Sequence, residues 1–152
     1  MALSIQKARG SAVSLGFVNV PTIGTPVPLS TNIDSNNSNS PGNVSAPPPQ
    51  FPGTQTESSP SFRAFHIQGF KPGANNNGMV VNSGNVYLLM AAAGGAGNRS
   101  DSGSIIAVIA PGADYFFPPD GSGNTRFSPY YLYLDADSNN DGGLVAGYGV
   151  EP

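Results

Sequence analysis

The chain has 152 residues and a formal net charge of −3, with 20 glycines, 15 prolines and only 10% charged residues. This length fits one domain, and so many glycines and prolines leave little room for long helices. Cysteine is absent and His66 is the sole histidine, which excludes disulfides, thiolate catalysis and cysteine-based metal sites.

Residues 1–60 are predicted to form an extended arm. The opening decapeptide lacks the apolar stretch of a secretory signal, so we expect synthesis and use without export. Alternating apolar and small residues predict a strand over 12–20, and the prolines that follow confine the chain to a sheet edge. Residues 31–60 are rich in Ser, Asn and Pro and hold too few large apolar side chains for a core. We expect the arm to become ordered on a partner or on sister subunits.

Residues 61–152 carry the pattern of an all-β domain, because short apolar runs alternate with clusters of turn-forming residues. The chain is therefore expected to fold as a β-sandwich or jelly roll that follows the arm. Strands are predicted over residues 63–70, 79–81, 85–91, 104–110, 114–117, 130–136 and 144–150.

Two of these strands make specific predictions about burial. The run from Ile105 to Ile109 is apolar on both faces, which predicts a central strand covered on both sides. In the strand over 130–136, alternation places three residues toward the core (Leu132, Leu134 and Ala136) and three outward (Tyr131, Tyr133 and Asp135). The outward tyrosines are either exposed aromatics on a sheet face or part of an interface.

The stretch from Asp135 to Gly143 has the clearest motif-like pattern in the chain. Oxygen-bearing side chains stand at alternate positions, Asp135, Asp137, Asn139 and Asp141, as in calcium loops. However, Ala146 stands where an EF-hand has its bidentate glutamate. We therefore weigh a hairpin loop rich in turn formers against a weak calcium site, and expect no other cofactor.

Signatures of catalysis and of nucleotide binding are missing from the sequence. The glycine-rich stretch 91–103 lacks the endings of phosphate-binding loops and is interpreted as a connection between strands. There is no Gly-x-Ser-x-Gly elbow, and His66 alternates with apolar residues as a sheet-surface residue would. Asp114, Asp120, Asp135 and Asp137 are explained by turns, so we expect no enzyme. The six basic residues are scattered along the chain, so we expect no binding to nucleic acid. Every apolar run is interrupted before it could span a membrane, so we expect no membrane insertion.

Several pieces of the chain together resemble phage head decoration, or cement, proteins and related small virion proteins with β-sandwich domains. The resemblance rests on residues Val20–Leu29, Asn82–Leu89, Ile109–Gly112 and Tyr131–Gly142. The chain departs from that pattern in its long Ser/Asn/Pro-rich insertion at 31–60.

The resemblance implies a non-enzymatic protein on the outer surface of a phage capsid, made in the host cytoplasm. It would bind the major capsid protein, form homo-oligomers there and stabilise contacts between capsid subunits. The predicted contact residues are Phe17, Val18, Val20, Ile23, Val27, Phe51, Tyr131 and Tyr133. Two alternatives stay open: a head-fibre, tail or receptor-binding subunit, and a carbohydrate-binding module.

Overall fold

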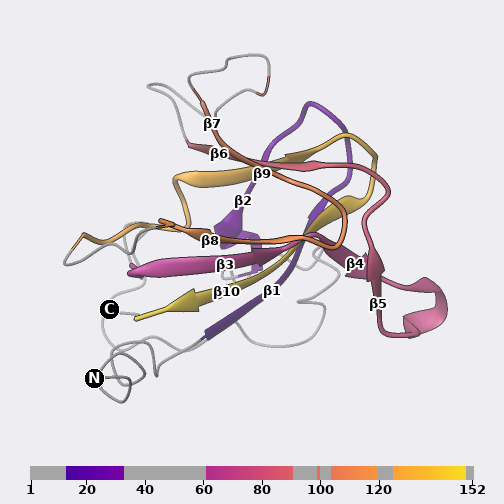
Figure 1. Ribbon diagram of the computed structural model, residues 1–152, viewed down its shortest axis with the longest axis horizontal. Helices are drawn as coiled ribbons and strands as arrows, with labels where there is room; N and C mark the ends of the chain where they lie inside the picture. Colours follow the sequence, from indigo (N-terminus) through magenta and orange to yellow (C-terminus); the bar gives the residue numbers. More distant parts are fainter. Residues whose placement is uncertain (1–12, 33–60, 91–98, 100–103, 120–124, 150–152) are drawn as a thin grey trace.

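Two four-stranded antiparallel sheets and a two-stranded hairpin make up the computed structural model, which describes residues 13–32, 61–90, 99, 104–119 and 125–149 (Figure 1). The strands are β1 (Val13–Val20), β2 (Val27–Pro28), β3 (Ala64–Gln68), β4 (Phe70–Pro72), β5 (Met79–Val81), β6 (Val86–Met90), β7 (Ile105–Ile109), β8 (Asp114–Phe117), β9 (Leu132–Ala136) and β10 (Asp141–Tyr148). Two short 3-10 turns, η1 (Leu29–Asn32) and η2 (Ala74–Asn76), are the helical elements of this part of the chain. Neither is long and apolar enough to cross a membrane.

The strand pairing is nested. β1 pairs with β10, β2 with β9, β3 with β8 and β6 with β7. The first strand in the sequence therefore pairs with the last, and each later pair lies between the strands of the pair before it in the sequence. Such nesting describes one long antiparallel ribbon rolled into two sheets, which is a jelly roll. Two further pairs complete the sheets as β1-β10-β3-β8 and β2-β9-β6-β7. The prediction of an all-β sandwich or jelly roll is confirmed.

The core lies between the two sheets and is built from alternate residues of their strands. On β3, Phe65 and Ile67 point inward and are fully buried, while the residues that alternate with them along the strand are partly exposed. On β9, Leu132, Leu134 and Ala136 are buried as the alternation predicted. These side chains belong to a core cluster of fifteen buried residues, which also contains side chains from β1, β6, β7, β8 and β10.

The first strand belongs to the sandwich, which corrects the predicted boundary after residue 60. β1 pairs with β10 from Val13 to Val20, and its Leu15, Val18 and Val20 lie in the core. β2 completes the second sheet beside β9. Residues 13–32 are therefore part of the β-domain and not of a separate arm, because burying their apolar side chains outweighs the cost of ordering them. Residues 1–12 and 33–60 lie outside the described part.

The prediction for the run from Ile105 to Ile109 is also wrong. β7 is an edge strand with β6 as its one neighbour, and the side chain of Val108 is 55% exposed. A register shift opposite Leu88 and Leu89 marks a bulge in this pair, a feature that edge strands often carry.

One predicted strand, over residues 63–70, is divided at Gly69 into β3 and β4. The Gly69 amide donates to the Ala113 carbonyl, and the Gly69 carbonyl accepts from Asn82 and Gly112. A Cβ at this position would lie 2.6 Å from the Ala110 carbonyl oxygen, so the close approach requires glycine. After this break β4 pairs with β5, and the hairpin projects from one end of the sandwich (Figure 1).

Candidate functional site

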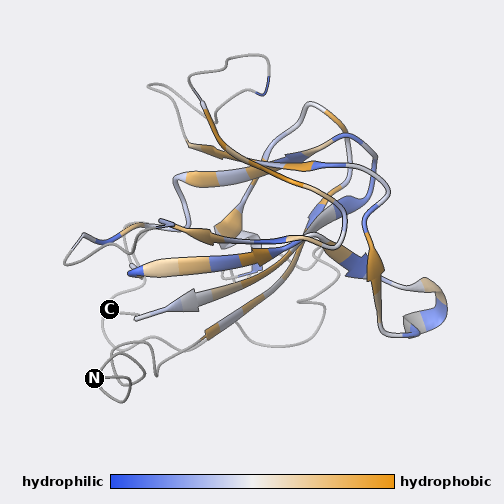
Figure 2. Cartoon of the chain, viewed as in Figure 1, coloured by the Kyte–Doolittle hydropathy of each residue, from blue (hydrophilic) through white to orange (hydrophobic). Residues whose placement is uncertain are grey.

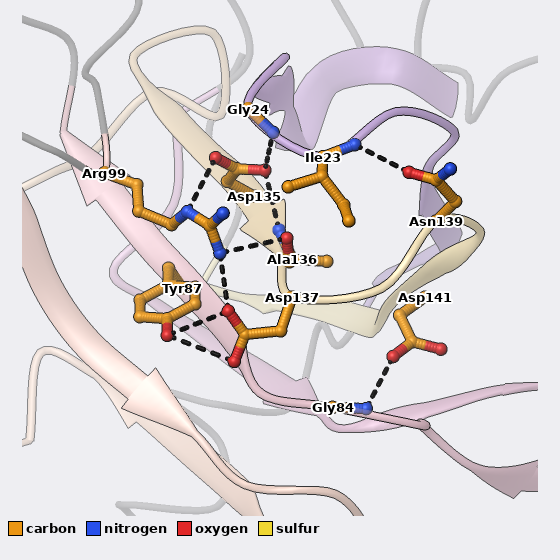
Figure 3. A network of polar contacts seen from close by, with 10 residues as sticks. All are labelled: Ile23, Gly24, Gly84, Tyr87, Arg99, Asp135, Ala136, Asp137, Asn139 and Asp141. Carbon is orange, nitrogen blue, oxygen red and sulfur yellow. Dashed lines mark hydrogen bonds and ion pairs between the residues drawn. The ribbon is translucent and has the colours of Figure 1, made fainter.

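The oxygen-rich stretch singled out in the sequence lies at the turn from β9 to β10, shown in Figure 3. β9 and β10 belong to different sheets, so this connection crosses the sandwich and is not the hairpin loop that was predicted. Asn140 adopts a left-handed conformation (φ 66°), and its amide donates to the Val20 carbonyl over 2.8 Å. Turn-forming residues thus redirect the chain from one sheet to the other.

Asp141 connects β10 to the base of the β4–β5 hairpin. Its Oδ1 accepts hydrogen bonds from Lys71 Nζ at 2.7 Å and from the Ser83 amide at 3.1 Å, and its Oδ2 accepts from the Gly84 amide at 2.8 Å. Burial of this carboxyl opposes its ionisation, but the hydrogen bonds from Lys71, Ser83 and Gly84 and the lysine charge outweigh that effect and lower the pKa of Asp141. The carboxylate is therefore a buried structural acceptor.

Asp135 is fully buried, although alternation predicted that it would face outward. Its Oδ1 accepts from the amides of Gly24 at 2.9 Å and Ala136 at 2.7 Å, which connects β9 to the turn between β1 and β2. Its Oδ2 lies 3.6 Å from Arg99 Nε and accepts no hydrogen bond. The prediction failed because the turn after β1 and Arg99 cover this position on the outer face of the sheet (Figure 3).

Arg99 and Asn139 engage the other side of the same turn. The Arg99 Nη1 donates to the Asp137 carboxylate at 2.5 Å and to the Ala136 carbonyl at 3.1 Å. Its guanidinium also lies 5.1 Å from the centre of the Tyr87 ring, within cation–π range. The Asn139 Oδ1 accepts from the Ile23 amide at 2.9 Å. These contacts hold the turn against β6 and the segment after β1.

The four proposed calcium ligands are each held by another part of the chain. Asp135, Asp137, Asn139 and Asp141 each engage a different protein donor, and their oxygens do not converge on one point (Figure 3). No group of three or more His, Cys, Asp or Glu able to hold a metal occurs within the described ranges. The alternating pattern in the sequence reflects a turn whose oxygens accept hydrogen bonds from neighbouring segments.

Three of the eight predicted contact residues are placed differently from the expectation. Phe17, Val18 and Val20 are buried in the chain itself, with exposed fractions of 6%, 0% and 0%, so their side chains cannot meet a partner. The Phe17 ring lies against the backbone of Gly142, where an added Cβ would be 2.9 Å from ring carbons. The sequence marked these apolar side chains as contact residues, but it did not show that the covering surface is their own sandwich.

The remaining predicted contact residues differ in accessibility. Ile23 and Tyr131 are exposed, whereas Val27 and Tyr133 are partly buried and Val27 packs against the core. Phe51 lies outside the described residues. Of the original set, Ile23 and Tyr131 therefore present the most accessible apolar surface.

Sequence reasoning missed the apolar strip of the projecting hairpin. Met79, Val80 and Val81 are 41%, 43% and 54% exposed, and β5 stands out as a hydrophobic strand in Figure 2. Both faces of a two-stranded ribbon lack a covering sheet, so consecutive apolar residues are exposed there. The only signal in the sequence is an apolar triplet flanked by Gly78 and Asn82. Such a triplet has the same pattern as a short buried strand, so the sequence does not show that it is exposed.

His66 lies on the outer face of the first sheet, as predicted. Its ring stacks on Phe116 with centroids 4.2 Å apart, and its Nε2 is 3.1 Å from the Asp114 Oδ2. Tyr148 is a further neighbour of Phe116, at 6.3 Å between ring centres. Of the carboxylates considered for catalysis, Asp135 and Asp137 belong to the turn network, Asp114 contacts His66, and Asp120 lies outside the described residues.

Comparisons with known proteins give no match: no family description, curated protein or solved structure is significantly similar to this chain.

Proposed function

We propose that the protein is a structural virion protein that binds the outside of a phage capsid and stabilises contacts between major capsid proteins. The observation that carries the proposal is the exposed apolar strip Met79–Val81 on a hairpin that projects from the sandwich. Exposed apolar side chains grouped on one element are typical of protein contact sites. The resemblance of four sequence segments to decoration proteins supports a capsid as the partner.

The geometry of the hairpin favours attachment. Lys71 on β4 binds the buried Asp141 carboxylate and also donates to the Ser83 hydroxyl at 2.7 Å, so both ends of the hairpin are fixed to the sandwich. A fixed apolar strip loses less conformational entropy on binding than a free loop does. Many copies that bind only the assembled shell stabilise the shell by mass action.

Replacing Met79, Val80 and Val81 together by serine tests the contact surface. We expect the triple variant to stop cosedimenting with purified capsids and to stop raising the temperature at which they release DNA. The matched control is Val108→Ser, which removes an equally exposed valine from β7. Circular dichroism verifies that both variants are folded. Binding of the folded triple variant at wild-type level would rule out the hairpin as the attachment surface.

One observation favours the alternative role as a head-fibre, tail or receptor-binding subunit. Tyr131 is 56% exposed and Tyr133 is partly exposed at the start of β9, away from the β4–β5 hairpin in the fold (Figure 1). Tyrosines are common in recognition surfaces because they combine a large apolar ring with a hydroxyl. Antibody labelling of intact particles in the electron microscope separates head from tail: signal distributed over the head shell supports decoration, and signal confined to the tail or to projecting fibres supports the alternative.

A further inference from the structure

The tip of the β4–β5 hairpin contains the only Asn-Gly step in the sequence, Asn77-Gly78. A backbone amide can attack the side-chain carbonyl of the preceding asparagine, and it does so most readily when the next residue is glycine, which has no Cβ to obstruct it. We propose that Asn77 is a site of spontaneous deamidation in the folded protein. The inference rests on the exposure and hydrogen bonding of this step and does not depend on the proposed function.

The structure leaves the reacting groups accessible. Asn77 and Gly78 are both exposed, and nothing lies within 4 Å of the position that a Cβ on Gly78 would occupy. The tip is held through other atoms: the Asn77 amide donates to the Ala74 carbonyl, and the Gly78 carbonyl accepts from Gly73 at 2.7 Å. The Gly78 amide, which is the nucleophile, is in neither of these hydrogen bonds.

The same structure protects comparable steps elsewhere. Asp141-Gly142 could form the same cyclic imide, but its carboxylate is buried and bound by Lys71 and two backbone amides. Asn82, followed by the small Ser83, is also buried, and its amide group donates to the Gly142 carbonyl at 2.7 Å. Sequence alone places Asn77-Gly78 first among these steps, and burial of the other two adds to the difference.

The reaction is balanced without any oxidant or reductant. The Gly78 nitrogen loses its proton to hydroxide, which becomes water, and forms a bond to the Asn77 Cγ. The bond from Cγ to Nδ2 then breaks, and Nδ2 takes a proton from water and leaves as ammonia, which restores the hydroxide. Water then opens the five-membered imide at either carbonyl, which gives aspartate or isoaspartate. Each product carries a negative charge at position 77, two residues before Met79, where the asparagine was neutral.

The hairpin geometry also predicts that the fold slows the reaction. The ψ angle of Asn77 is 58°, and the peptide that follows must rotate before its nitrogen can reach Cγ. This rotation moves the Gly78 carbonyl, which is hydrogen-bonded to Gly73. We therefore expect the folded protein to react more slowly than a free peptide with the sequence of residues 70–82, but at Asn77 before any other described asparagine.

The test is incubation of the full chain in mildly alkaline buffer, followed by peptide mapping with tandem mass spectrometry. The expected result is a mass gain of about one dalton at Asn77, the change from an amide to an acid. In water enriched in ¹⁸O the product gains the heavy oxygen, and an isoaspartyl methyltransferase labels part of it. Asn77→Gln, which extends the side chain by one methylene, is expected to abolish the gain, whereas Asn82→Gln leaves it unchanged.

The result that would overturn the inference is an intact Asn77 amide in the folded chain over the period in which the free peptide converts completely. Conversion first at Asn82 or Asn85 would also overturn it. Capsid binding by Asn77→Asp is measured separately and rests on the proposed function: its loss would connect the added charge to attachment. Unchanged capsid binding would count against the hairpin contact and leave the mass measurement unaffected.

Discussion

Asp141 and Gly142 show how single residues fix the register of this sandwich. A Cβ at position 142 would lie 2.0 Å from the Val18 carbonyl oxygen, so only glycine allows β1 and β10 to pair at this point. The preceding carboxylate accepts three hydrogen bonds from the segment around β4 and β5. The pair thus joins β10 to its neighbouring strand on one side and to the hairpin on the other.

The lowered pKa of Asp141 makes the stability of the fold depend on pH. Because the folded pKa lies below the usual value of 3.8, the ionised carboxylate stabilises the fold fully above that value, and this contribution is lost as pH falls through the folded pKa. At about pH 6 we expect Asp141→Asn to lower the free energy of unfolding by about 2 kcal/mol, since hydrogen bonds to a buried charge are lost. At about pH 3 the difference from wild type should shrink.

Urea unfolding at the two pH values measures this effect. The control is Asp114→Asn, whose carboxylate is 60% exposed, and its expected change is within about 0.5 kcal/mol at both pH values. A difference between Asp141→Asn and wild type that stays constant with pH would contradict the assigned role of the charge.

At the scale of elements, β1 and β7 both differ from the roles that their sequences suggested. β1, predicted as part of an arm, contributes three side chains to the core, and β7, predicted as a central strand, stands at an edge. Apolar alternation fixes which side of a strand is buried, but it does not identify the surface that covers it. That surface is determined by strand order, which requires contacts between segments far apart in the chain.

A pair of matched valine substitutions tests the burial assigned to β1 and β7. Val18→Ala removes two methyl groups from a fully buried side chain on β1 and is expected to lower the free energy of unfolding by about 2 kcal/mol. Val108→Ala removes the same groups from an exposed position on β7 and should change it by less than about 0.5 kcal/mol. Chemical denaturation of both variants provides the comparison, and equal effects would refute the assigned burial.

At the scale of the whole molecule, nesting makes the two ends of the described fold interdependent. β1 pairs with β10, and β2 pairs with β9, so the first and last strands complete the same two sheets. Removal of β1 and β2 would expose core residues such as Leu134 and Val145 and leave the β10 edge unpaired. The strands after residue 60 therefore depend on residues 13–32.

Truncation variants test this interdependence by calorimetry. We expect the full chain to unfold in one cooperative transition and the variant lacking residues 1–60 to show none. Replacement of residues 33–60 by a Gly/Ser segment of equal length is the control, and it is expected to keep the transition because β1 and β2 remain. A folded product from the first truncation would restore the boundary at residue 60.

Composition, charge and periodicity by themselves determined the all-β class, the positions of most strands and the inward side of β9. These properties are local, because turn residues and alternation act within a few positions of the chain. Tertiary structure alone decided that β1 completes the sandwich, that Asp141 of the β9–β10 turn accepts a hydrogen bond from Lys71 on β4, and that Met79–Val81 are exposed. Each of these outcomes depends on which distant segment covers a residue, and a single sequence does not encode that pairing in any local pattern.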